Sequence, residues 1–348
     1  GNISVFVPHI GCPHRCSFCN QNIITGENFS PKSEDVIKAV ETAAAYPYYD
    51  PKHTELAFFG GSFTAIPLDY MTELLNTGYE FYKKGVVSGI RISTRPDAIN
   101  DEILTLLKSK GVTAIELGCQ SLNDEVLRKN HRGHTALDAK KSSELIKKQG
   151  FSLGLQMMTG LLGDTDEFAL QTAKKIISYG ADTVRIYPTL LLKGTYLYSL
   201  YKKGEYAPQT LEQAVELTSK LLLLFEENNV NVIRVGLHTV ERDGFVAGPW
   251  HPAFGELCKS RVLIKKVLKI IEDKKIPKGD ILIAVPKGKI SAMTGQKRSN
   301  IDFLNEIGYN VKIAENVDLN ECDFIKEAYE QKKWAFVADY VRTKVLYE

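Results

Sequence analysis

Short apolar runs alternate with amphipathic segments over the first half of the chain. The apolar runs predict β-strands at residues 3–7, 54–59, 90–94, 113–118, 151–157 and 182–187. Apolar residues at helical spacing predict helices at residues 33–45, 101–109, 137–148 and 167–178. Such alternation is typical of a parallel sheet covered by helices, so the pattern predicts an α/β fold of six strand–helix units.

The C-terminal part of the chain follows a different pattern. It predicts a helix at residues 257–271, a strand at 280–285, a helix–loop–helix unit around 294–301 and a strand at 308–313. We therefore expect two domains, an α/β domain at residues 1–250 and a small α+β extension at residues 251–348.

Three cysteines, Cys12, Cys16 and Cys19, lie on a loop directly after the first predicted strand. Three thiolates on a short loop can bind a soft metal centre. A [4Fe–4S] cluster held by three cysteines keeps one iron open to another ligand. The spacing therefore favours a cluster at which chemistry occurs.

Three other uses of these cysteines are less well supported. A zinc site needs a fourth ligand, and only His9 or His14 is close enough in sequence. An odd number of clustered cysteines is a poor disulfide framework. A purely structural cluster normally has a fourth thiolate, and Cys119, Cys258 and Cys322 are isolated in the sequence.

Glycine and polar residues stand where the predicted strands end. Taken singly, most such side chains hydrogen-bond to neighbouring backbone. Active sites of barrels built from strand–helix units lie at the carboxyl ends of the strands, so together these residues favour one site. The candidates are Gly60, Gly61, Ser62, Arg95, Gln120, Ser121, Gln156 and Arg185.

The cysteine spacing, with Phe18 before the last cysteine, resembles the signature of the radical S-adenosylmethionine (SAM) enzymes. The resemblance implies a partial (β/α)6 barrel that binds a [4Fe–4S] cluster through the three cysteines and SAM beside it. It also implies SAM-binding roles. Backbone groups of the segment from Gly60 to Ser62 would bind the amino group of SAM. Gln120 and Ser121 would lie near its ribose and carboxylate, and Arg132 would pair with the carboxylate. Met157 would pack against the adenine. Met157 is equally suited to an ordinary core position.

Several segments narrow the resemblance to the catalytic subunit of the elongator complex, over roughly residues 3–262. They are PHIGCPHRCSFCNQ, FFGGSFT, STRPD, GCQS, RGHT, RIYPT and KGTYLY. The family modifies C5 of the wobble uridine of transfer RNA with SAM and acetyl-coenzyme A. Lys193 matches a basic position in a loop beside its active site, and with Arg185 and Tyr187 it is a candidate catalytic residue. The chain ends at Glu348 without room for the family's acetyltransferase domain, so we expect that domain to be lacking.

Positive charge is concentrated near the C-terminal end. Residues 259–312 hold 13 Lys and Arg and 5 Asp and Glu, although the whole chain has a net charge of +2. Residues 295–298 resemble the G-x-x-G loop of a KH-type RNA-binding unit, with Arg298 in place of the second glycine. Lys287, Lys289, Lys297 and Arg298 are therefore candidate RNA contacts, although a short basic loop is often only a solvated surface.

Composition limits the remaining possibilities. With 44% apolar and 25% charged residues the chain is an ordinary globular protein, and its apolar runs are too short to span a membrane. Cysteines without a paired framework suit a reducing compartment, so we expect a cytoplasmic enzyme. The expected partners are RNA, most readily transfer RNA, and an electron donor such as flavodoxin or ferredoxin, and neither a membrane nor DNA. Two alternatives stay open: a radical SAM enzyme that acts on a small metabolite or peptide, and a non-catalytic RNA-binding protein with a structural cluster.

Overall fold

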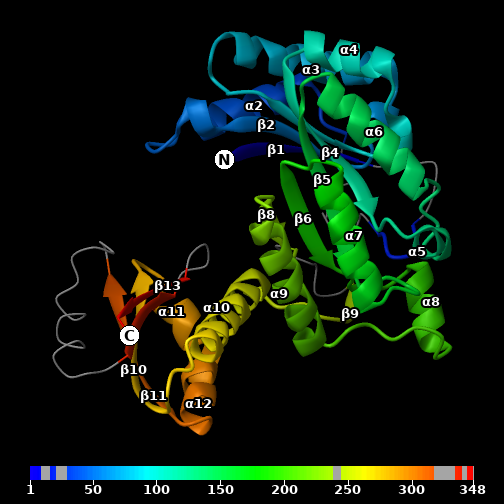
Figure 1. The fold of residues 1–348 in the computed structure, drawn as a ribbon. Helices are drawn as coiled ribbons and strands as arrows, with labels where there is room; N and C mark the ends of the chain where they lie inside the picture. Colours follow the sequence, from blue (N-terminus) through cyan, green and yellow to red (C-terminus); the bar gives the residue numbers. More distant parts are fainter. Residues whose placement is uncertain (9–15, 21–29, 238–243, 317–333, 339–342, 348) are drawn as a thin grey trace. The chain divides into compact units, whose positions relative to one another are not determined.

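The computed structural model describes residues 1–8, 16–20, 30–237, 244–316, 334–338 and 343–347 (Figure 1). By its internal contacts the chain divides into two compact units. Unit 1 comprises Gly1–Ala214 and Glu227–Trp250, and unit 2 comprises Val215–Glu226 and His251–Glu348. Within the described ranges, no helix combines the length and the apolar character that crossing a bilayer requires.

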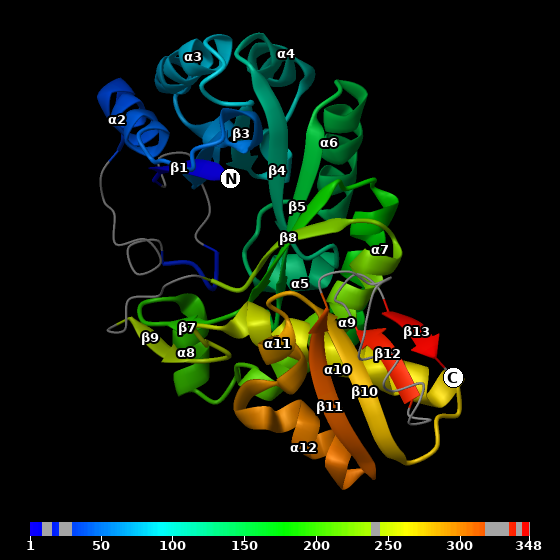
Figure 2. The same ribbon diagram turned by 90° about the vertical axis from the view of Figure 1, so that its left-hand side faces the viewer.

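Unit 1 is built on a sheet of seven strands in the order β1-β2-β3-β4-β5-β6-β8, and all neighbouring pairs are parallel (Figure 2). The strands are β1 (Asn2–Val7), β2 (Glu55–Gly60), β3 (Ile90–Thr94), β4 (Val112–Gln120), β5 (Ser152–Thr159), β6 (Thr183–Pro188) and β8 (Asn231–Val235). The helices between them are α2 (Ser33–Ala44), α3 (Leu68–Lys83), α4 (Asp101–Ser109), α5 (Asp124–Lys129), α6 (Ala136–Lys148) and α7 (Asp166–Ser178). The predicted α/β fold is confirmed, with β8 as a further strand.

The two faces of the sheet differ in chemistry. Side chains on one face are apolar and fully buried, as with Leu56, Ile92 and Ile115. Successive side chains of a strand point to opposite faces, so Arg91 and Glu116 lie on the other face. The sequence therefore provides one face for packing and one polar face inside the partial barrel.

Local signals start the helices at the expected places. Thr135 accepts a hydrogen bond from the backbone N–H of Asp138, whose carboxylate accepts one from the N–H of Thr135, and this capping box begins α6. Asn100 caps α4, because its side chain accepts a hydrogen bond from the N–H of Ile103. These caps fix where the chain leaves the carboxyl end of each preceding strand.

Further elements of the chain follow β6. β7 (Leu191–Leu192) pairs with β9 (Phe245–Ala247), and α8 (Tyr196–Lys202) follows β7. Phe18 packs against an apolar cluster formed by Leu191, Leu197, Leu200 and Tyr206. The helix α9 (Leu211–Glu227) then passes from unit 1 into unit 2.

Unit 2 has a sheet of four strands in the order β11-β10-β12-β13. The strands are β10 (Gly279–Pro286), β11 (Tyr309–Asn316), β12 (Trp334–Ala338) and β13 (Thr343–Tyr347), and the helices are α10 (Phe254–Asp273), α11 (Ile290–Thr294) and α12 (Ser299–Glu306). β10 is parallel to both of its neighbours, and β13 is antiparallel to β12. The predicted order of strand, two short helices and strand is confirmed, and β12 and β13 are additions to it.

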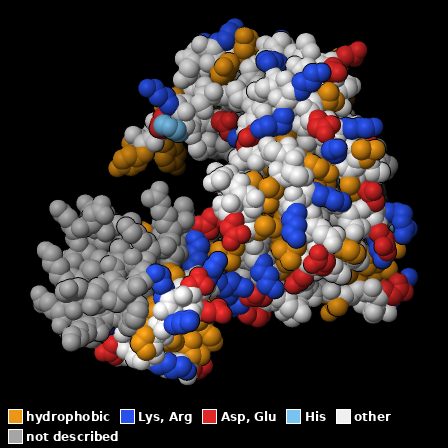
Figure 3. All heavy atoms as spheres, in the orientation of Figure 1, with side chains coloured by type: hydrophobic (Ala, Val, Ile, Leu, Met, Phe, Trp, Pro, Cys, Tyr) orange, Lys and Arg blue, Asp and Glu red, His pale blue; other side chains and the backbone are white. Residues whose placement is uncertain are grey.

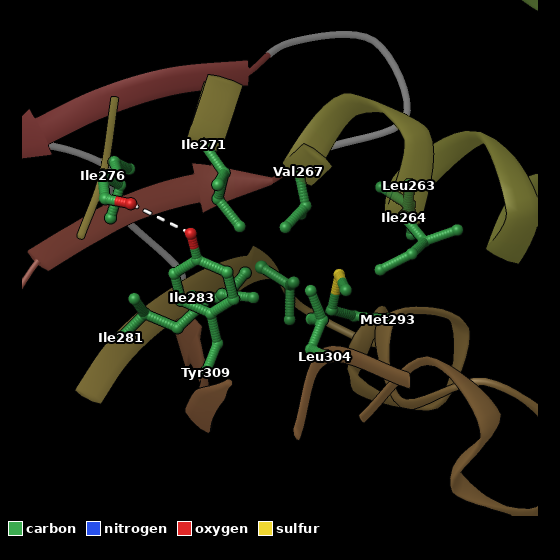
Figure 4. Packing of buried hydrophobic residues seen from close by; sticks show 11 residues of the cluster. Leu263, Ile264, Val267, Ile271, Ile276, Ile281, Ile283, Met293, Leu304 and Tyr309 are labelled. Atoms are coloured by element: carbon green, nitrogen blue, oxygen red, sulfur yellow. Dashed lines mark hydrogen bonds between the residues drawn. The ribbon is translucent and has the colours of Figure 1, made fainter. Parts of the chain in front are cut away.

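The core of unit 2 packs its helices against one face of β10 (Figure 4). Val267 and Ile271 of α10 meet Ile283 of β10 and Leu304 of α12 in one apolar cluster. The Tyr309 hydroxyl donates to the carbonyl of Ile276 at 2.9 Å. The buried polar end of this tyrosine thus has a partner, as a packed core requires.

Candidate active site

The described part of the cysteine loop, residues 16–20, is fixed by bonds to distant segments. Ser17 is fully buried. Its hydroxyl donates to Asn130 Oδ1 at 2.7 Å, and its backbone N–H donates to the Asn130 carbonyl at 3.1 Å. The Ser17 carbonyl accepts from the N–H of Leu197 at 2.9 Å. The loop that carries Cys16 and Cys19 is thus held in place, while Cys12 lies outside the described residues.

Most of the predicted site residues of unit 1 line one cavity of about 140 Å³. The cavity lies where the cysteine loop meets the carboxyl ends of β2, β3 and β4, as expected for a barrel of this kind. The predicted residues that line it are Cys16, Cys19, Gly60, Gly61, Ser62, Arg95, Gln120, Arg132 and Gln156.

The end of β2 approaches β1 closely. Gly60 has φ +124°, and a Cβ on it would lie 2.2 Å from the Val7 carbonyl oxygen. Only glycine fits there, because any larger residue would clash with backbone and be strained at this φ. The Ser62 hydroxyl is within 2.9 Å of Thr94 Oγ1 and accepts from the N–H of Arg95 at 3.1 Å. The Ser62 side chain therefore stabilises the end of β3. The SAM contact predicted for this segment is one with its backbone groups.

The two arginines of the cavity differ in their partners. Arg95 forms a bidentate pair with Asp97, at 2.5 Å from Nε and 2.6 Å from Nη2. Arg132 donates from Nη1 to the Cys16 sulfur at 3.0 Å and from Nη2 to the Gly118 carbonyl at 2.5 Å. Arg132 forms no ion pair with any residue in the described part of the chain. Asp97, which neutralises Arg95, was not among the predicted site residues.

Two buried polar atoms at the cavity have no hydrogen-bond partner among the described residues: Gln120 Oε1 and Arg132 Nε. Gln120 has a left-handed φ of 65°, and the pairing of β4 with β5 is irregular between Gly118 and Gln120. A buried polar atom without a hydrogen-bond partner lowers the stability of the fold. A bound ligand can provide the missing partner. Together with the thiols of Cys16 and Cys19, these two atoms suit a cavity that receives a metal cluster and a polar cofactor.

Five predicted residues do not line this cavity. Ser121 Oγ accepts from the N–H of Asn123 at 3.2 Å, and Met157 is fully buried. Lys193 is exposed, but its carbonyl accepts from Asn20 Nδ2 at 3.0 Å, so its backbone lies beside the cysteine loop. The other two, Arg185 and Tyr187, lie on β6 inside the partial barrel. The roles assigned to these residues stay predictions.

Glu116 is a residue that the sequence analysis missed. It is 1% exposed and accepts from Arg185 at 2.6 Å and 2.9 Å, from Gln156 Nε2 at 2.9 Å and from Arg91 at 3.3 Å. The Arg185 guanidinium also lies over the ring of Phe59, 4.9 Å from its centroid. Arg185 is therefore fixed by a buried carboxylate, and the same carboxylate orients Gln156 at the cavity.

His134 lies in the loop before α6 and is 5% exposed. Burial, and then the charge of Arg132, lower the pKa of its ring from 6.5 to about 4. The His134 ring therefore binds a proton more readily in the unfolded chain than in the folded protein. As the pH falls from 6.5 towards 4, this difference lowers the free energy of unfolding. We expect His134→Asn to lose part of this decline, measured as urea midpoints at about pH 7.5 and about pH 5.

The control for this prediction is His131→Asn in the same loop. His131 is exposed and has a left-handed φ of 56°, which asparagine tolerates. We expect it to leave the pH dependence as in the wild type. Equal pH dependence in His134→Asn and the wild type would contradict the prediction.

The four predicted RNA contacts lie in unit 2. Lys287 and Lys289 follow β10, and Lys297 and Arg298 lie between α11 and α12 with left-handed φ angles of 53° and 67°. Lys287, Lys289 and Lys297 form no ion pair with described residues, and Arg298 Nε is 3.9 Å from Asp302.

Other cations of this basic stretch are neutralised within unit 2. Arg261 and Lys265 of α10 pair with Glu216 of α9, and Lys266 pairs with Glu226. On the face in Figure 3, Lys and Arg are interspersed with Asp and Glu. The charge excess counted along the sequence therefore overstates the basic character of α10, whereas Lys287, Lys289 and Lys297 of the loops have no ion-pair partner among the described residues.

Two family models match the chain. The Radical SAM superfamily matches residues 6–176, and the Radical SAM C-terminal domain matches residues 181–263. The chain therefore belongs to the radical SAM superfamily of enzymes, in agreement with its partial barrel and its cysteine loop.

Within the superfamily the chain is a relative of the elongator proteins. It is 30% identical over 185 residues to the tRNA uridine(34) acetyltransferase of Methanocaldococcus infernus. This match covers 47% of this chain and 35% of that protein. It is 28% identical over 261 residues to Elongator complex protein 3 of Schizosaccharomyces pombe. That match covers 62% of this chain and 48% of that protein. The chain thus spans about half the length, or less, of these curated relatives. The resemblance seen in the sequence is confirmed.

A solved structure agrees in fold. The Methanocaldococcus infernus Elp3 with an N-terminal deletion has a TM-score of 0.57 at 22% identity, over 80% of this chain and 66% of that chain. Membership of the superfamily makes a [4Fe–4S] cluster and SAM the cofactors of this chain. The thiols of Cys16 and Cys19 fit the cluster as ligands. Gln120 Oε1 as an acceptor and Arg132 Nε–H as a donor, both without a partner among the described residues, fit a polar cofactor.

Proposed function

We propose that this protein reductively cleaves SAM at a [4Fe–4S] cluster and acts on RNA, specifically transfer RNA. The observation that carries the proposal is the single cavity in which Cys16, Cys19 and Arg132 meet the strand-end residues Gly60 and Gln120. The chemistry that the cofactors supply when bound is one-electron cleavage of SAM, which yields a radical able to abstract hydrogen.

The chain's own residues bind and orient in this reaction. The cysteine thiolates hold the cluster, and the backbone at Gly60 and Gly61 receives the polar end of SAM. Glu116 holds Arg185 and Gln156 inside the partial barrel. Burial raises the pKa of the Tyr187 phenol, so this residue keeps its proton at neutral pH and can donate a hydrogen bond to substrate. Lys193 is the candidate cation beside the cysteine loop.

The names of the relatives support transfer RNA as the substrate, because the match to a tRNA uridine(34) acetyltransferase extends over 47% of this chain. The unpaired cations of the loops in unit 2 support contact with phosphates. We place the reaction in the cytoplasm, with a small electron-transfer protein such as flavodoxin or ferredoxin as reductant.

The proposal is tested by incubating the anaerobically reconstituted, reduced protein with SAM, with and without transfer RNA. We expect 5′-deoxyadenosine to form and its yield to rise when transfer RNA is present. Formation of 5′-deoxyadenosine that no RNA influences would contradict the choice of substrate and favour a small molecule. No cleavage of SAM by protein that holds its cluster would contradict the reaction.

RNA binding should depend on the loop between α11 and α12. We expect Lys297→Glu with Arg298→Glu to weaken transfer RNA binding by at least about tenfold, because fewer counterions are released from phosphates. The slope of log K against log salt should become shallower by about 1.4–1.8, the contribution of two phosphate contacts. Electrophoretic or anisotropy titrations at several salt concentrations measure both.

The matched control makes the same charge change in unit 1. Lys140→Glu with Lys141→Glu reverses two adjacent exposed lysines on α6. We expect its RNA affinity to stay near the wild-type value. If both double variants lose affinity equally, the loop has no special role and only the overall charge matters.

A further inference from the structure

The connection between α5 and α6 contacts the cysteine loop at Asn130 and Arg132, and contacts α8 at His131. Asn130 is fully buried and bonds to Ser17 through its side chain and its backbone. The ring of His131 lies against the ring of Tyr196, with centroids 4.9 Å apart. Arg132 then donates to the sulfur of Cys16 at 3.0 Å. This connection thus anchors the metal-binding loop and places a cation against one of its sulfurs.

The Arg132 guanidinium is held in one position. Its Nη2 bonds to the Gly118 carbonyl near the end of β4 while its Nη1 bonds to Cys16, so two of its nitrogens are engaged at once. The other arginine of the cavity, Arg95, is neutralised by its bidentate pair with Asp97. Among the described residues that line the cavity, Arg132 is therefore the cation without a carboxylate partner.

A cluster that takes up an electron becomes more negative. A positive charge and an N–H donor at a ligand sulfur stabilise the reduced form more than the oxidised form, and hydrogen bonds to sulfur are among the factors that set the potential of such clusters. The effect is large in a partly buried site, where water screens the charge less. Arginine stays protonated at all working pH values, so the effect is constant.

We propose that Arg132 is a positioning residue that raises the reduction potential of the cluster through Cys16 and so eases electron uptake. This inference rests on the proposed function, because it requires that the cysteines bind a cluster. It differs from the SAM-carboxylate role predicted for Arg132, since it holds without SAM.

The test compares the wild type with Arg132→Gln and Arg132→Lys, reconstituted anaerobically in the absence of SAM and RNA. Iron and sulfide analysis first establishes about four of each per chain. Titration with dithionite, followed by electron paramagnetic resonance of the reduced cluster, then gives the midpoint potential. We expect Arg132→Gln to shift the one-electron equilibrium at least tenfold towards the oxidised form, which is about 59 mV to lower potential. Arg132→Lys keeps the charge but loses the paired N–H donors of the guanidinium, so it should lower the potential by a smaller amount.

The matched control is Arg128→Gln, which removes an exposed arginine of α5 whose side chain makes no contact with the described residues of the cysteine loop. It should leave the potential unchanged. A wild type that assembles no cluster would refute the proposed function itself. An Arg132→Gln protein with a full cluster and the wild-type potential would overturn this inference and leave the proposed function intact. Weaker SAM binding in that protein would then support the predicted pairing of Arg132 with the SAM carboxylate.

If Arg132→Gln fails to retain iron, the comparison of Arg132→Lys with the wild type decides. Lysine has a single nitrogen and cannot bond to Gly118 and Cys16 with the geometry of a guanidinium. A potential equal to that of the wild type would then count against the inference, and a lower one would support it.

Discussion

Replacing Cys16 or Cys19 by alanine should remove the cluster and with it all cleavage of SAM. Each thiolate occupies one iron of a three-cysteine cluster, and the loss of one leaves a second iron without a protein ligand. The same result is expected for Cys12→Ala. The measurements are iron and sulfide content, absorption in the near-ultraviolet and visible range after reconstitution, and formation of 5′-deoxyadenosine.

Cys258→Ala is the control. Cys258 is fully buried in α10, and burial raises the pKa of its thiol to about 12, so it is a poor metal ligand. We expect its cluster content to equal that of the wild type. Stoichiometric zinc without iron uptake in the wild type would contradict the assignment of the cysteines.

The second large effect is expected at Glu116. Glu116→Ala leaves Arg185 without its carboxylate inside the partial barrel, and Arg91 keeps only Glu55. Removal of one partner from a buried ion pair costs about 3–5 kcal/mol, because the remaining charge is uncompensated. Urea unfolding followed by circular dichroism measures this loss in the free energy of unfolding.

Glu125→Ala is the matched control, because its partner Lys129 is on the same helix and both side chains are exposed. It should change stability little. Replacing Glu116 and Arg185 together by leucine should recover part of the loss, since no charge is then left alone. A Glu116→Ala protein as stable as the control would show that water or other groups satisfy Arg185.

The sequence predicted those elements whose signals are local. The strands β3 and β4 are buried, so their β-branched residues stand out from the flanking turns. The helix α3 was not predicted because Gly78 lies within it, and glycine lowers helix propensity. The structure explains this glycine, since a Cβ on it would lie 2.8 Å from Leu56 on β2. The strand β8 was missed because Asn231 and Arg234 interrupt a short apolar run.

The same distinction applies to the candidate site. Cysteine spacing and glycine pairs are local patterns, and they led to Cys16, Cys19 and Gly60. Glu116 and Asp97 have roles only through arginines, and for Glu116 these arginines lie on other strands. A glutamate in the middle of an apolar strand, with arginines in the middle of two other strands of the same sheet, is the signal by which the Glu116 network could have been found.

The Glu116 network also affects how the strands of the sheet can align. Glu55, Arg91, Glu116, Gln156 and Arg185 come from the five successive strands β2 to β6, and their hydrogen bonds run from strand to strand across one face. A slip of one residue in any of these strands would turn its polar side chain into the apolar layer. The penalty for a misplaced charge there amounts to several kcal/mol. Competing registers are thereby disfavoured, so the network that orients the site also favours the one alignment in which that site exists.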